Sequence, residues 1–169
     1  MERTTTQNES AKVVEQAAQY LTFKIGNETY GVDVASVREV INYEKVFQIP
    51  SVPDNIRGVI NLRGEVVPII DLSFRFYGKK SVETKMTSIV IMEINSEGEM
   101  MHIGVIIDAI NAVQDILPGD IEHTPEFGSK IRADFISGVG KTDGKFIIIL
   151  NISRVLDVSE LSDFASTMK

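Results

Sequence analysis

The residue types that most often carry out chemistry are few in this sequence and lie far apart. The chain has no cysteine and two histidines, His102 and His123, and neither histidine has a His or Cys companion at the spacing of a zinc site. The stretch GVGKT, residues 138–142, resembles a phosphate-binding loop, but Phe135 stands where that loop needs its first glycine. We therefore expect no metal, no cofactor and no catalytic residues.

One hairpin-like stretch, in contrast, occurs twice. GVINLRGEVVPIIDL covers residues 58–72, and GVGKTDGKFIIILNI covers residues 138–152. The glycines of the two stretches coincide, and an Asp-Gly pair such as that of the second stretch supplies the positive φ angles that tight hairpin turns require. Only the tips differ in charge, because Arg63 in the first stretch is replaced by Asp143 in the second.

The length and composition are those of an ordinary globular protein. Of the 169 residues 43% are hydrophobic, and the formal net charge of −7 would repel nucleic-acid phosphates. The sequence has no apolar run of the roughly 18 residues that a membrane span needs, so we expect neither a nucleic-acid partner nor direct membrane insertion. The absence of cysteine suits a reducing cytoplasm. The polar residues 1–18 are expected to form a flexible N-terminal tail.

The duplication extends over most of the chain. YLTFKI, residues 20–25, corresponds to IVIMEI, residues 89–94, and GVDVASVREVI, residues 31–41, corresponds to GVIIDAINAVQ, residues 104–114. The short β-branched and aromatic runs in each unit predict five strands. Such strands bury their apolar faces and protect their edges best as two small barrels packed together, so we expect a mainly β fold of two pseudo-repeated five-stranded barrels.

The expected limits of these parts follow from the repeat. The first barrel is expected at about 30–85 and the second at about 89–152, with strand 19–26 as a candidate to complete one of them. LSFRFYG at 72–78 predicts a short linking helix, and 159–169 predicts a C-terminal helix or tail. SVREVI, residues 36–41, fits a helical turn and a strand equally well.

The repeat, the stretch GVINLRGEVVPIIDL and the stretch YGVDVASVREV together resemble the CheW family of bacterial chemotaxis coupling proteins, over a single CheW-like domain at about 19–158. The resemblance implies two SH3-like barrels and a non-catalytic adaptor. It would couple the cytoplasmic tips of chemoreceptors to the regulatory domain of the histidine kinase CheA and scaffold the signalling array. The protein would be cytoplasmic, recruited to arrays at the inner membrane, and monomeric when free.

The resemblance also implies the residues that contact these partners. The receptor and kinase interface would include Val37, Glu39, Val40, Gly58 and Arg63. The second-barrel candidates are His123 and Phe127. Each residue has a plainer interpretation: the glycine and Arg63 as turn residues, the valines and Phe127 as core, and Glu39 as a solvated side chain. Glu39 and Arg63 could pair across the barrel surface.

A different class of function fits the same expected shape. A groove between two barrels could bind a small molecule or a peptide, which would make the protein a sensor. The residues alone do not exclude this alternative. The opposite charges of the two hairpin tips favour the adaptor, because a bridging protein needs two different faces and divergence after duplication supplies them.

Overall fold

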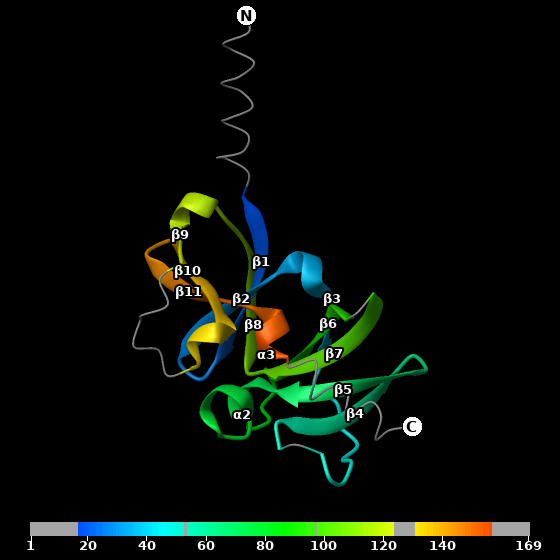
Figure 1. Ribbon diagram of the computed structural model, residues 1–169. Coiled ribbons are helices and arrows are strands. Elements are labelled where there is room, and N and C mark those ends of the chain that lie inside the picture. The colour runs from blue at the N-terminus through cyan, green and yellow to red at the C-terminus, as the bar shows by residue number, and fades with distance from the viewer. Residues whose placement is uncertain (1–16, 53, 97, 124–130, 157–169) are drawn as a thin grey trace, which may run out of the picture.

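The structure is a computed structural model of the chain, and it describes residues 17–52, 54–96, 98–123 and 131–156. Within these ranges the protein is mainly β, with strands in two packed sheets and short helical segments at the strand ends (Figure 1). The mainly β fold class is therefore confirmed. The first sixteen residues of the expected N-terminal tail, Phe127, and the expected C-terminal segment 159–169 lie outside the described residues.

The two sheets differ in size. The six-stranded sheet has the order β8 (Ala109–Ile116), β1 (Ala18–Ile25), β2 (Glu28–Asp33), β11 (Lys145–Leu150), β10 (Ile136–Thr142), β9 (Ile121–Glu122). The five-stranded sheet has the order β3 (Val37–Asn42), β6 (Ser88–Ser96), β7 (Glu99–Ile107), β5 (Glu65–Asp71), β4 (Ile56–Leu62). Both orders are open, so within the described residues neither sheet closes on itself, and the expected barrels are better described as packed sheets.

Each repeat exchanges its opening hairpin with the other repeat. The strands β1 and β2 of the first repeat join the six-stranded sheet, and β6 and β7 of the second repeat join the five-stranded sheet. One side of each exchanged hairpin is joined by a parallel ladder, in which Tyr30 of β2 pairs with Ile148 of β11 and Gly104 of β7 pairs with Ile69 of β5. The other side is joined by an antiparallel ladder, β1 with β8 and β6 with β3. Neither sheet is therefore contiguous in the chain, and the sheet boundaries depart from the limits 30–85 and 89–152 expected for two barrels.

Short connections accompany this exchange. The 3-10 turn η1 (Val34–Ser36) separates β2 from β3, and Asp108 alone separates β7 from β8. Since a hairpin needs at least two turn residues with suitable φ angles, β8 cannot fold back beside β7 after Asp108, and it passes into the other sheet. After η1 the chain also passes into the other sheet, where β3 pairs with β6. The segment with two interpretations, residues 36–41, is mainly the strand β3.

The main apolar core lies between the sheets and takes residues from both. Phe23, Tyr30 and Val32 of the six-stranded sheet belong to the same buried cluster as Met92 and Val105 of the five-stranded sheet. A second cluster fills the other face of the five-stranded sheet: Ile60, Leu62, Val67, Ile69, Ile89, Ile91, Ile106. The strands β5 and β6 are therefore buried on both faces, which explains why their sequences are almost continuously apolar.

Short helices follow the repeated hairpins. The helix α2 (Leu72–Tyr77) begins at Asp71, whose side chain accepts a hydrogen bond from the Phe74 N–H, and it ends at Gly78 in the left-handed conformation. The helix α3 (Ile152–Val155) begins in the same way at Asn151. The linking helix predicted at 72–78 is confirmed. The remaining turns are η2 (Pro118–Asp120) and η3 (Ala133–Phe135).

Candidate functional site

The tip of the β4–β5 hairpin presents Arg63 to solvent. Arg63 and Gly64 both have positive φ angles, 49° and 88°, and the Gly64 N–H donates to Asn61 Oδ1 at 2.8 Å. Two consecutive positive φ angles give the two-residue turn that matches the twist of antiparallel strands. The other repeat builds the same turn from Asp143 and Gly144, with φ angles of 51° and 75°.

The side chain of Arg63 reaches the edge strand β3 and forms an ion pair with Glu39. The Arg63 side chain is 64% exposed and that of Glu39 is 28% exposed, so the pair lies at the surface. The hydrogen bond from Arg63 is the main reason that the pKa of the Glu39 carboxyl lies below its usual value. The pairing expected from the sequence is therefore present. An exposed pair of this kind contributes little to folding stability.

The two valines of β3 differ in their surroundings. Val40 is 41% exposed, so its alternative interpretation as a core residue is wrong. Val37 is partly buried and packs against the main apolar cluster, as a core residue would. Along β3 half-buried and exposed residues alternate, which is the pattern of a strand with one face toward solvent. Val40 lies on the exposed face, whereas the neighbouring Glu39 points to the half-buried face, where it meets Arg63.

Gly58 has a structural reason to be glycine. It sits at a bulge in the β4–β5 pairing with φ at 143°, and a Cβ atom there would lie 1.9 Å from the carbonyl oxygen of Phe47. The neighbouring Val59 exchanges two backbone hydrogen bonds with Phe47, each 2.9 Å long. Gly58 thus lets the segment around Phe47 lie against β4, and the Phe47 side chain itself is 71% exposed.

A charged cluster around His102 joins three strands to β7. His102 Nδ1 lies 2.6 Å from Glu65 Oε2, and Nε2 lies 3.3 Å from Glu93 Oε1 and 3.2 Å from Nη1 of Arg38. Arg38 also donates to Glu93 at 3.2 Å, while the His102 side chain is only 13% exposed. Sequence reasoning missed the cluster because the partners of His102 come from β3, β5 and β6.

The cluster covers one end of an apolar layer. Glu93 and His102 are directly paired across β6 and β7. Since side chains alternate along a strand, Glu93 shares a face with Ile91, and Glu65 shares a face with Val67. Ile91 and Val67 both belong to the second apolar cluster. The charged groups therefore continue the buried face of the five-stranded sheet out to its surface.

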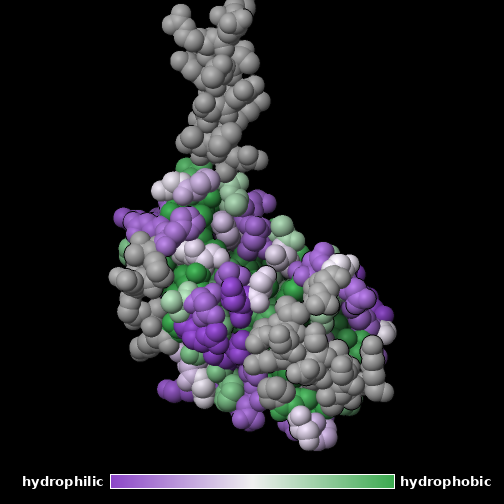
Figure 2. All heavy atoms as spheres, in the orientation of Figure 1, coloured by the Kyte–Doolittle hydropathy of each residue, from purple (hydrophilic) through white to green (hydrophobic). Residues whose placement is uncertain are grey.

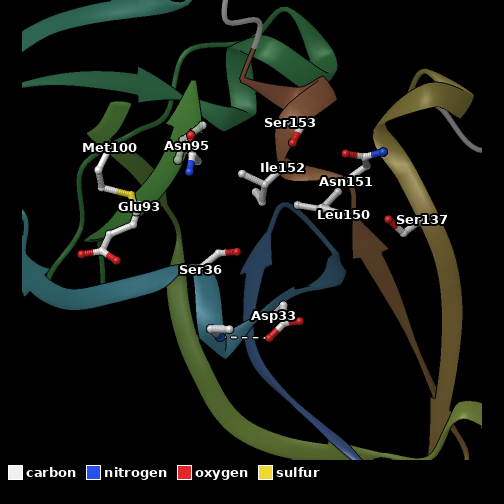
Figure 3. A pocket seen from close by; sticks show the side chains of 12 residues that line it. Asp33, Ser36, Glu93, Asn95, Met100, Ser137, Leu150, Asn151, Ile152 and Ser153 are labelled. Carbon is white, nitrogen blue, oxygen red and sulfur yellow. Dashed lines mark hydrogen bonds between the residues drawn. The ribbon is translucent and has the colours of Figure 1, made fainter. Parts of the chain in front are cut away.

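A cleft of about 440 Å³ lies between the two sheets near η1. Figure 3 shows its walls: Asp33 and Ser36 from the turn at η1, Glu93 and Met100 from the five-stranded sheet, and a group from the six-stranded sheet and α3 that includes Asn151. The Asp33 side chain is held by a hydrogen bond of 2.9 Å from the Ala35 N–H. The lining is mixed, polar and apolar, and its carboxylates stand on opposite walls.

Of the two interface candidates in the second repeat, His123 and Phe127, the structure describes only His123. His123 Nδ1 lies 3.0 Å from the carbonyl oxygen of Ser137, next to Gly138, where a Cβ atom would meet Ile121 at 2.8 Å. Phe127 lies outside the described residues. In the part of the chain that the structure describes, no group of three or more His, Asp or Glu side chains is arranged to hold a metal ion. None of the helices described there is long and apolar enough to cross a membrane.

Figure 2 shows hydrophilic residues over much of the visible face, with hydrophobic residues in small areas between them. Several large apolar side chains are nevertheless exposed on the described surface: Val40, Phe47, Val66, Val82, Met86, Met100, Val113, Leu117, Phe146. Exposed apolar residues that are scattered singly are normal on folded proteins, so they do not by themselves define a binding surface.

Comparison with known proteins identifies the family. The family model of the CheW-like domain matches residues 19–160. The chemotaxis protein CheW of Klebsiella aerogenes is 31% identical over 144 residues, covering 85% of this chain and 84% of that protein. The chemotaxis protein CheW of Treponema pallidum is 30% identical over 158 residues, covering 91% of each. The crystal structure of the scaffolding protein TtCheW from Thermoanaerobacter tengcongensis matches with a TM-score of 0.75 and 35% identity, covering 85% of this chain and 90% of that one.

The chain belongs to the CheW family of chemotaxis scaffold proteins. The resemblance drawn from the sequence is therefore confirmed.

Proposed function

We propose that this protein is a non-catalytic adaptor that couples the cytoplasmic tips of chemoreceptors to the regulatory domain of the histidine kinase CheA. Membership of the CheW family supports this proposal. The observation that carries it is the surface ion pair of Glu39 and Arg63, with the exposed Val40 next to Glu39 in the sequence of β3. The other repeat has Ala112 and Asp143 at the positions of the charged pair, so the two ends of the molecule offer different chemistry.

The first contact surface would comprise the exposed side of β3 and the β4–β5 tip. Val40 and Arg63 would touch the partner, Glu39 would orient the guanidinium, and Gly58 would keep the backbone in place without touching the partner. Val37 would support β3 from below, since it packs against the main core. Exposed apolar atoms beside a fixed charge are typical of the centre of a protein interface, where Arg is enriched.

The second contact surface would lie on the other repeat, near His123 and Phe127. Its use for a further kinase-domain contact would let one molecule bind two neighbours in an array. The free protein would be a cytoplasmic monomer that is recruited to receptor arrays at the inner membrane. A scaffold needs two surfaces that can be occupied at the same time, and two surfaces on different repeats meet that need.

Calorimetric titration tests the proposal directly. The protein is titrated with the regulatory domain of its cognate CheA, and the titration is repeated with a receptor signalling-tip fragment present. Saturable binding to both partners without competition is expected. Absence of binding to either partner would contradict the proposal.

Variants then locate the first surface. Arg63→Ala and Val40→Glu should weaken binding of at least one partner about tenfold, the size typical of an important interface residue. Val113→Glu is the matched control, because Val113 occupies the position of Val40 in the other repeat and is also exposed, at 56%. A weakening by Val113→Glu equal to that by Val40→Glu would show that the surface is not on β3.

The cleft of about 440 Å³ supports a second candidate, a sensor for a small molecule or a peptide. Its volume is within the range of small-molecule sites, although such sites are usually more apolar. A thermal-shift screen with metabolites distinguishes the two candidates. A stabilising metabolite, together with a lack of binding to the CheA domain and receptor tip, would favour the sensor.

A further inference from the structure

His102 stands where two hydrogen-bond patterns compete. Its Nδ1 faces Glu65 at 2.6 Å, and its Nε2 faces both the Glu93 carboxylate, at 3.3 Å, and the Arg38 guanidinium, at 3.2 Å. A carboxylate can only accept and a guanidinium can only donate. Nε2 therefore cannot satisfy both neighbours at once, and its protonation decides which contact is favourable.

The neutral ring suits Arg38. With one proton, placed on Nδ1, the ring donates to Glu65, and Nε2 accepts from Arg38. Arg38 at the same time donates to Glu93 at 3.2 Å, so one guanidinium holds β3 to both β6 and β7. This arrangement fixes the side chain of an edge strand that pairs only with β6.

The charged ring suits Glu93 instead. With a second proton Nε2 donates to Glu93, and the imidazolium then faces the Arg38 guanidinium as a like charge at 3.2 Å. Like charges at this distance repel, and the Arg38 side chain, 43% exposed, has room to turn into solvent. The charged groups that face His102 are thus Arg38 from β3, Glu65 from β5 and Glu93 from β6.

Displacement of Arg38 would reach the first contact surface. Arg38 lies at a bulge in β3, between Val37 and Glu39. Glu39 is influenced by Arg38 and His102 as well as by its partner Arg63. Protonation of His102 and release of Arg38 would therefore change the electrostatic field at the Glu39–Arg63 pair, beside the hairpin tip.

We propose that His102 is a positioning residue that makes partner binding at the β3 surface depend on pH, by holding Arg38 when neutral and releasing it when charged. Imidazole is the side chain suited to this task, because it changes charge near neutral pH. The proposal rests on the proposed function only in assigning the β3 surface to a partner. The movement of Arg38 is a property of the free protein.

The experiment uses the full chain without substitution for every affinity measurement. A His123→Gln variant serves only to assign the ring signals, because the sequence has one other histidine. Nuclear magnetic resonance follows the His102 ring and the Arg38 Nε–H between about pH 5.5 and about pH 8. Calorimetry gives the affinity for the receptor tip and for the CheA domain at the two ends of this range. We expect the Arg38 signal to move with the His102 titration, and the affinity to fall about two- to fivefold at the lower pH.

Two variants separate a positioning role from a structural one. His102→Gln should keep the affinity of the higher pH and lose the pH dependence, since an amide cannot gain the charge. Arg38→Gln should also lose the pH dependence. Because Arg38 is exposed, this variant should fold even if His102→Gln does not, and it then provides the test. An undiminished pH dependence in Arg38→Gln, or an Arg38 signal that does not follow His102, would overturn the proposal. Absence of binding at every pH, with the Arg38 movement present, would instead contradict the proposed function.

Discussion

The two repeated hairpins, β4–β5 and β10–β11, share a backbone but differ in what their side chains hold. At the tips the φ angles of Arg63 and Asp143 differ by only 2°, being 49° and 51°. Arg63 forms an ion pair with Glu39, whereas the position that corresponds to Glu39 carries Ala112 in the other repeat. Duplication thus kept the turn, which is set by glycine and local backbone preferences, while the exposed side chains became free to specify different partners.

The two hairpins also differ in the hydrogen bonds made by the residue at the end of their second strand. The buried carboxylate of Asp71 accepts hydrogen bonds from Arg57, and from the N–H and hydroxyl of Ser81 at 2.8 Å and 2.6 Å. Its counterpart Asn151 caps α3 through a contact of 3.4 Å with the Arg154 N–H. Asp71 therefore anchors the connection that follows α2, whereas Asn151 serves its own helix.

The largest expected effect comes from removing the anchor of the first repeat. Asp71→Ala leaves the Arg57 guanidinium, 25% exposed, without its buried partner. Loss of one member of a buried ion pair lowers the free energy of unfolding by about 3–5 kcal/mol. Asn151→Ala, which removes only a helix cap, should cost about 1 kcal/mol. Urea denaturation followed by circular dichroism measures both, and equal losses would show that the two residues are equivalent.

The next largest effect is expected from substituting the glycines at the bulges of the two hairpins, Gly58 and Gly138. In Gly58→Ala the new Cβ would meet backbone, the Phe47 carbonyl oxygen, at 1.9 Å, so the free energy of unfolding should fall by about 2–4 kcal/mol. In Gly138→Ala the new Cβ would meet the Ile121 side chain at 2.8 Å and the Glu122 carbonyl oxygen at 2.9 Å, which is a milder overlap than that at Gly58. We expect about 1–2 kcal/mol there. Thermal denaturation of the two variants checks this order, and a reversed order would contradict the role given to Phe47.

Exchange of the tip charges should act on binding and hardly on stability. Asp tolerates the left-handed conformation, so Arg63→Asp keeps the turn but places a second carboxylate beside Glu39. Binding of at least one partner should weaken about tenfold or more, while the melting midpoint stays nearly unchanged because the pair is exposed. Asp143→Arg is the matched variant on the other repeat. If Arg63→Asp binds both partners normally, the first tip is only a turn.

The smallest expected effect is the titration of Glu39 itself. Arg63 lowers the pKa of the Glu39 carboxyl, so the pair is fully formed above the usual carboxyl range and is lost as the pH falls through this lowered pKa. In Arg63→Gln the pKa of Glu39 should rise toward its usual value. Carboxyl carbon resonances across an acid titration measure the change. An unchanged pKa would mean that the two side chains do not pair in solution.

Much of this protein is determined by local sequence. The duplicated glycines, the short β-branched runs and the Arg-Gly and Asp-Gly pairs predict the hairpins and their tips, because turn geometry and strand preference depend on neighbouring residues. The pairing of Glu39 with Arg63 could also be predicted, because both residues were expected on the surface of the same barrel. The repeat, together with the stretches around Arg63 and Val37, was sufficient to predict the family.

Tertiary structure alone decided which strands share a sheet and which charges meet. The exchange of opening hairpins depends on ladders between strands distant in sequence, such as the parallel pairing of Ile69 with Gly104 and the antiparallel pairing of β1 with β8. The cluster around His102 depends on that exchange, since it gathers Arg38 and Glu65 from the first repeat and Glu93 from the second. Strand register, which is set by burial over the whole molecule, brings these charges together, and no local pattern encodes it.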